Sequence, residues 1–79
     1  MDALEKLGWQ KNVRGSGLIR YSYDRQCKTT PIIAYIDIFE NACQIDLYEQ
    51  IGDEAGYLYL TKEELLALAE IVKEIENAT

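Results

Sequence analysis

The sequence predicts an α+β fold, in which an antiparallel meander of four to five strands follows a short N-terminal helix and carries a C-terminal helix packed on one face. Three observations favour it. Several short segments alternate apolar and polar residues, as strands do. Turns that contain glycine separate some of these segments. In residues 62–77 the apolar residues instead recur three and four positions apart, which is the spacing of a helix. A chain of 79 residues has room for one hydrophobic core, so we expect a single domain over residues 1–79.

Five segments have the composition of strands: residues 9–13, 18–24, 32–39, 43–49 and 57–60. A helical turn is predicted before them, because Asp2 can cap residues 3–7 and Gly8 suits the left-handed conformation that ends a helix. The first two strands are joined at residues 14–17, where two glycines supply the positive φ angles of a hairpin turn.

The second strand places Ile19, Tyr21 and Tyr23 on one face, and we expect that face to join the core. Basic residues interleave with these tyrosines, as they do on surfaces that bind single-stranded nucleic acid. The alternation, however, turns Arg20 to the opposite face of the strand. The sequence therefore argues against direct nucleic-acid binding by this segment.

The third and fourth strands form the central hairpin. Residues 32–39 are apolar on both faces except at Asp37, which is typical of a central strand. A two-residue loop at Glu40 and Asn41 brings the aliphatic side chains of both strands to one face. The predicted pairs are Ile38 with Cys43, Ile36 with Ile45, and Ala34 with Leu47.

The last third of the chain predicts a turn, a strand and a helix. An acidic turn at residues 52–56 precedes the closing strand. Thr61, with Glu64 three residues later, is a capping box that starts a helix over residues 62–77. Five residues at helical spacing form its predicted buried stripe: Leu65, Leu68, Ala69, Val72 and Ile75.

The two halves of the chain carry opposite net charge. Its formal net charge is −6, which opposes non-specific binding to nucleic acid or anionic lipid. Residues 1–30 sum to +3 and residues 31–79 to −9, so the C-terminal half is the end expected to steer a basic partner. No segment approaches the ~20 apolar residues of a membrane span, and the first ten residues lack the apolar region of a signal peptide. We expect a cytoplasmic protein that does not enter the membrane.

The residue types present argue against catalysis. The chain has no histidine, which excludes Ser-His-Asp and Cys-His pairs and zinc sites with histidine ligands. Its two cysteines, Cys27 and Cys43, are expected to be reduced and structural. Asp37 and Asp46, diagonal neighbours in the predicted hairpin, form a carboxylate pair, but no nucleophile or pocket motif accompanies them, and two solvated carboxylates are expected. We therefore expect no enzymatic activity, no cofactor and no bound metal.

Two surfaces are candidates for binding a partner. The first, the acidic ridge, consists of Glu63, Glu70 and Glu74, which fall within about 40° of each other on the side of the helix opposite the predicted stripe. It is either a solvated helix face or a partner-facing ridge, because the ~6 Å rise from Glu70 to Glu74 is close to the phosphate spacing along a nucleic-acid strand.

The second surface, the aromatic face, lies on the side of the central hairpin that a single C-terminal helix leaves uncovered. Aromatic residues ringed by polar groups are typical of protein interfaces. The alternative is that the N-terminal segment with Trp9 folds across this face and completes the core. Its predicted partner-binding residues are Tyr35, Asp37, Phe39, Asp46 and Tyr48.

Two short motifs and the acidic hairpin between them carry a resemblance to a family. The motifs are Leu4-Glu5-Lys6-Leu7-Gly8-Trp9 and Leu60-Thr61-Lys62-Glu63-Glu64-Leu65. With them the chain resembles small uncharacterised prophage and mobile-element proteins of Gram-positive bacteria, although such proteins more often end in Gly-Trp after the helix, where this chain has Ala78-Thr79. The resemblance implies a cytoplasmic bacterial host and a role through protein contact.

Two functional hypotheses follow. The first is a non-enzymatic, phage-type interaction module, acting as an acidic inhibitor of a host nucleic-acid enzyme or defence complex. The second is a structural or assembly module that forms a homodimer through Tyr35, Phe39 and Tyr48.

Overall fold

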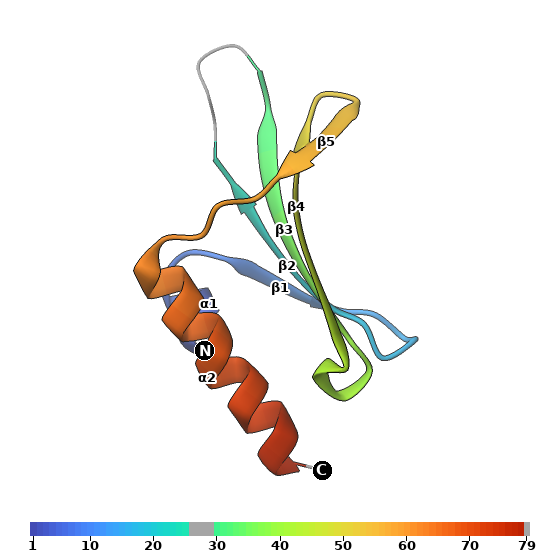
Figure 1. Cartoon of the computed structure of the whole chain (residues 1–79), viewed down its shortest axis with the longest axis vertical. Coiled ribbons are helices and arrows are strands. Elements are labelled where there is room, and N and C mark those ends of the chain that lie inside the picture. Colours follow the sequence, from blue (N-terminus) through green and yellow to red (C-terminus); the bar gives the residue numbers. More distant parts are fainter. Residues whose placement is uncertain (26–29, 79) are drawn as a thin grey trace.

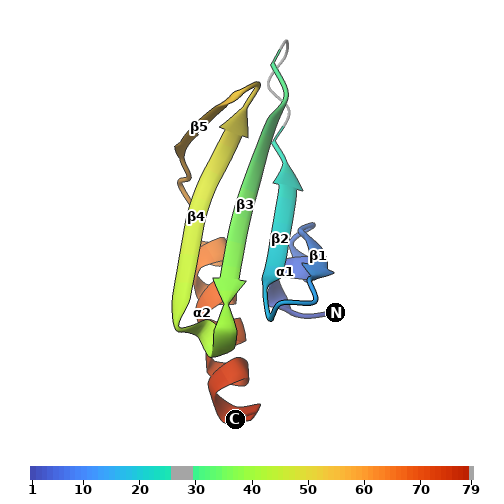
Figure 2. The same ribbon diagram turned by 90° about the vertical axis from the view of Figure 1, so that its right-hand side faces the viewer.

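A computed structural model describes residues 1–25 and 30–78 and confirms the predicted fold class (Figure 1). One antiparallel sheet contains five strands in chain order: β1 (Gln10–Val13), β2 (Ile19–Asp24), β3 (Ile32–Phe39), β4 (Gln44–Ile51) and β5 (Glu54–Tyr57). The short helix α1 (Ala3–Lys6) precedes the sheet and α2 (Lys62–Ala78) follows it. Both helices lie on the same side of the sheet (Figure 2). Neither described helix is long and apolar enough to cross a membrane.

The N-terminal turn forms as its capping residues predict. The Asp2 carboxylate accepts hydrogen bonds from the backbone N–H groups of Leu4 and Glu5, at 3.1 and 3.0 Å, and the Glu5 carboxylate accepts one from the Asp2 N–H. Gly8 follows α1 with a φ of +101°, and a Cβ at this position would lie 3.1 Å from the Tyr23 ring. Glycine is therefore required at Gly8 by both backbone conformation and space.

The predicted register of the central hairpin is wrong by two residues. Ile38 lies opposite Ile45, Ile36 opposite Leu47, and Ala34 opposite Glu49. The predicted two-residue loop would require positive φ at Glu40, but the structure places the positive angles at Asn41 (53°) and Ala42 (62°), within the 3₁₀ turn η1 (Glu40–Ala42). Because side chains alternate with a period of two, this shift leaves the assignment of residues to the two faces unchanged.

The prediction for the closing strand is also wrong. β5 spans Glu54–Tyr57, so the chain reverses at Gly52 and Asp53 rather than over residues 52–56. Gly52 has a φ of +58°, which allows a tight two-residue reversal directly after β4. Leu58 and Leu60, predicted in the strand, lie in the connection to α2 and pack against the core.

The core lies between the sheet and the two helices. Its buried members are Leu4, Trp9, Tyr21, Ala34, Ile36, Ile38, Ala67, Leu68 and Ile71. Ile19 and Tyr23 pack against them, so the core face predicted for β2 is confirmed. Trp9 is only 3% exposed, but it is buried on the side of the helices. The alternative in which Trp9 covers the aromatic face is therefore wrong.

The buried stripe of α2 agrees with the prediction only in part: Leu68 is buried and Val72 and Ile75 pack against the core, but Leu65 and Ala69 do not. Glu64, Ala67, Leu68 and Ile71 are buried, whereas Leu65 is 57% exposed and Ala69 is also exposed. At 100° per residue, the centre of these four buried positions lies roughly 85° from the centre of the predicted stripe. The cause is the N-terminal segment: Trp9 binds Glu64, and α1 packs beside Ala67. Helical periodicity alone contains no information about this neighbour.

Replacing Ile36, which is fully buried in the central strand, is expected to destabilise the protein strongly. Ile36→Ala removes core methyl groups and leaves a cavity, so the free energy of unfolding should fall by about 2–5 kcal/mol in urea denaturation. Val13→Ala, at a position 67% exposed on the edge strand β1, should change it by less than about 0.5 kcal/mol. Equal losses in the two variants would contradict the assignment of the core.

Candidate functional site

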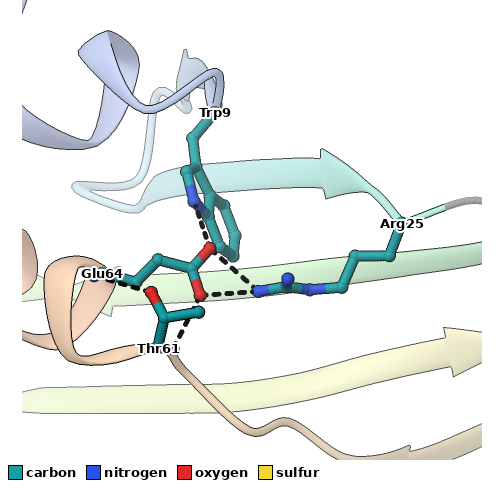
Figure 3. Close-up of polar contacts among 4 residues, drawn as sticks. All are labelled: Trp9, Arg25, Thr61 and Glu64. Atoms are coloured by element: carbon teal, nitrogen blue, oxygen red, sulfur yellow. Dashed lines mark hydrogen bonds and ion pairs between the residues drawn. The ribbon is translucent and has the colours of Figure 1, made fainter.

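The buried carboxylate of Glu64 joins three distant parts of the chain (Figure 3). Its Oε2 accepts a hydrogen bond of 2.9 Å from the Trp9 indole Nε1–H. Arg25 Nη2 lies 2.8 Å from Oε1 and 2.9 Å from Oε2. Oε1 also accepts the Thr61 backbone N–H, and the Glu64 N–H donates to Thr61 Oγ1, which completes the predicted capping box. We call these four residues the Glu64 cluster.

The hydrogen bonds of the Glu64 cluster indicate a structural role. Each carboxylate oxygen has two donors, so no lone pair is left for a substrate proton. Burial raises the pKa of Glu64, but the bonds from Thr61, Arg25 and Trp9 outweigh it and hold the pKa below its ordinary value of 4.5. The Arg25 guanidinium also lies 5.6 Å from the centre of the Trp9 ring. The capping box was visible in the sequence, but the contacts with Trp9 and Arg25 were not.

The aromatic face is assembled on β3 and β4 as predicted. Tyr35 and Tyr48 lie directly opposite each other, with ring centres 5.1 Å apart and planes inclined by 27°. Both rings and Phe39 are half-buried. Burial, with a hydrogen bond to Asp37, raises the pKa of Tyr48. The Tyr35 and Tyr48 rings stack on each other. Because the alternate residues Ala34 and Ile36 face the core, these rings lie on the other side of the sheet, away from the helices.

The prediction of two solvated carboxylates is wrong for Asp37, which is buried, whereas Asp46 is only half-buried and bonds an exposed glutamine. The register brings them directly opposite each other, and Asp37 is only 4% exposed. Arg20 on β2 binds both oxygens of Asp37, at 2.8 and 3.0 Å, and the Tyr48 hydroxyl donates to Asp37 at 3.0 Å. Gln44 Nε2 donates to Asp46. The Asp37 oxygens therefore face donors of the protein itself, Arg20 and Tyr48, as in a structural ion pair.

The prediction from the sequence did not include one tyrosine of this face. Tyr57 on β5 lies opposite Tyr48 and is 85% exposed. It extends the row formed by Tyr35 and Tyr48 to the edge of the sheet. Because the turn was predicted at residues 52–56, Tyr57 was not placed opposite Tyr48. The correct pairing of β4 with β5 would have been needed to predict it.

The acidic ridge is exposed, but it is not opposite the buried stripe. Because α2 is turned, Glu63, Glu70 and Glu74 lie on the flank of the helix that faces α1. With Leu66 they form one wall of a groove of about 470 Å³. The other wall is formed by residues in and around α1: Met1, Asp2, Ala3, Lys6 and Leu7. We call this the α1–α2 groove.

The described part of the chain shows where Cys43 and the acidic side chains lie relative to one another. Among residues 1–25 and 30–78, no group of three or more His, Cys, Asp or Glu side chains is placed to hold a metal ion. Cys43 is free and exposed in the β3–β4 connection, so its predicted place on the aliphatic face of a strand is wrong. Cys27 lies outside the described residues.

The chain matches no protein-family model, no curated protein and no solved structure.

Acid is expected to destabilise the protein through the Glu64 cluster. A carboxyl whose pKa is lowered by folding stabilises the native state above its unfolded pKa, and this contribution is lost as the pH falls through the folded pKa. Glu64→Gln should therefore lower the free energy of unfolding by about 1–3 kcal/mol at neutral pH and reduce its fall below about pH 4.5 in urea denaturation. The pKa of Asp2 is also lowered, so some acid sensitivity should remain.

Glu63→Gln is the matched control, because Glu63 is the adjacent residue and is exposed. It should leave both the stability at neutral pH and the acid sensitivity close to wild type. An unchanged pH profile in Glu64→Gln would show that the carboxylate does not fix α2.

Proposed function

We propose that this protein is a non-enzymatic interaction module that binds a basic protein through its acidic ridge. In the phage-type, cytoplasmic setting that the resemblance implies, it would act as an inhibitor of a host nucleic-acid enzyme or defence complex. The observation that carries the proposal is the state of Glu63, Glu70 and Glu74. All three are exposed on one flank of α2, and none forms an ion pair with another described residue.

Three unpaired carboxylates on one flank favour a cationic partner. Glu70 and Glu74 are one helical turn apart, and such a like-charged pair costs the free helix a few tenths of a kcal/mol. A basic surface relieves this repulsion when it binds. The rise of ~6 Å between them approaches the phosphate spacing of a single strand, which suits a protein groove that otherwise holds a nucleic-acid backbone.

The two buried acidic side chains support the non-enzymatic part of the proposal. Glu64 and Asp37, the two buried carboxylates, are each held by an arginine. A general base needs a lone pair directed at substrate, and these carboxylates direct theirs at protein donors. Their chemistry is that of structural ion pairs.

Charge reversal on the ridge tests the proposal. Glu70→Lys combined with Glu74→Lys should slow association with a basic nucleic-acid-binding protein by at least about tenfold, because electrostatic steering is lost. The partner is first captured from Gram-positive bacterial lysate at low ionic strength and identified, and its association rate is then measured. Wild-type binding should weaken steeply as salt is added.

Glu40→Lys with Glu54→Lys is the control, since it makes the same charge change at exposed positions outside α2. This variant should retain most of the association rate, and both variants should unfold at wild-type urea concentrations. Capture of no basic protein, or binding that salt does not weaken, would contradict the proposal.

A homodimer is the second candidate, and Tyr57 favours it. This side chain is 85% exposed and lies opposite Tyr48 in the sheet, so it extends the row of Tyr35 and Tyr48. The helices lie on the other side of the sheet (Figure 2). Exposed aromatic rows of this kind are typical of contact surfaces.

The dimer hypothesis predicts twice the monomer mass in light scattering at tens of micromolar protein. Tyr57→Glu should restore the monomer, because it places a charge in the contact, and its high exposure leaves the fold unaffected. Leu65→Glu, on α2, should remain dimeric. A wild-type monomer at this concentration would exclude the homodimer.

A further inference from the structure

The α1–α2 groove combines apolar and acidic surface. Leu66 on α2 is 60% exposed and Leu7 at the end of α1 is 40% exposed, and both line the groove. Two alanines, Ala3 and Ala67, also line it and add small apolar side chains to the lining. A concave surface with two solvated leucines gains free energy when an apolar group covers it.

The charges around these leucines are mostly negative. The acidic ridge supplies three carboxylates, while Lys6 is the one basic residue among the described lining residues. Asp2 also lines the groove, but its carboxylate is occupied by the Tyr21 hydroxyl at 2.6 Å and by Lys11 at 3.5 Å. The ridge carboxylates therefore remain available to an occupant of the groove.

This charge pattern selects among possible occupants. A second copy that docked groove to groove would bring two acidic ridges together, and nucleic acid or an anionic lipid surface would be repelled in the same way. A cationic segment with an apolar side chain complements both components of the lining.

We propose that the α1–α2 groove binds a lysine- or arginine-rich segment of a protein partner that carries one large apolar side chain. The apolar side chain packs between Leu7 and Leu66, and the basic side chains face the acidic ridge. This inference rests on the proposed function and specifies the pattern of its partner.

The spacing on α2 defines that pattern. Glu63 precedes Leu66 by three residues and Glu70 follows it by four, which corresponds to rises of about 4.5 Å and about 6 Å. In a helical segment the basic residues therefore lie three and four positions from the apolar residue, one turn before it and one turn after it. Desolvation of the two leucines adds a contribution that salt does not weaken.

Two synthetic peptides test the inference on the full chain. The first is a lysine-rich helical peptide with a central leucine and lysines three and four positions to either side. The second has serine in place of that leucine. In NMR titrations of methyl-labelled protein, the leucine peptide should shift the Leu7 and Leu66 methyl signals and bind at least about tenfold more tightly than the serine peptide.

Two adjacent leucines provide matched variants. Leu66→Gln should remove the preference for the leucine peptide, whereas Leu65→Gln should preserve it. Leu65 is 57% exposed, close to the value for Leu66, but does not line the groove. Because both residues are exposed, both variants are expected to fold, and urea denaturation checks this.

The outcomes separate this inference from the proposed function. If both peptides bind equally and shift Glu70 and Glu74 amide signals but not the Leu66 methyls, the ridge binds cations and the groove inference is overturned. If neither peptide shifts any of these signals, both the groove inference and the binding of basic partners by the ridge are overturned.

Discussion

The position of α2 depends on one buried carboxylate. Glu64 receives hydrogen bonds from Trp9, Arg25 and Thr61, and so joins the N-terminal segment, the end of β2 and the start of the helix. With Glu64 drawn inward, Ala67 and Leu68 enter the core and Leu65 is turned outward. This orientation of α2 about its axis also places the acidic ridge beside α1. A structural ion pair thus determines which surface of the helix is available to a partner.

Carboxylates have two separate roles in this protein. The buried ones, Glu64 and Asp37, are each held by arginine and by a further donor, because an unpaired buried charge would cost several kcal/mol. The ridge carboxylates are exposed and form no ion pair among the described residues. The first group stabilises a sheet covered by helices on one side only, and the second gives the surface its negative potential. The total charge of −6 does not distinguish these roles.

Local signals in the sequence predicted the fold well, and long-range contacts account for what it missed. The Thr61–Glu64 cap and the face assignments of β2 depend on residues close together in the chain, and both are confirmed. The positive φ angles at Asn41 and Ala42 shift the hairpin register by two residues from the predicted one. The residues predicted on each face of the hairpin are nevertheless correct, since a shift of two residues preserves the alternation of side chains. The partners of Glu64 are 55 and 39 residues away, and Asp37 is 17 residues from Arg20. Periodicity carries no information about such pairs, so neither the rotation of α2 nor the burial of Asp37 could be predicted.

Solvent paramagnetic relaxation of methyl signals measures most directly which face of α2 is turned toward the core. A soluble gadolinium chelate broadens the NMR signals of exposed methyl groups and spares buried ones. The structure predicts strong broadening for Leu65, Leu66 and Ala69, and protection for Ala67, Leu68 and Ile71. Protection of Leu65 and Ala69 together with broadening of Ala67 would contradict it, because the helix would then have the orientation that periodicity alone predicts and the acidic ridge would face away from α1.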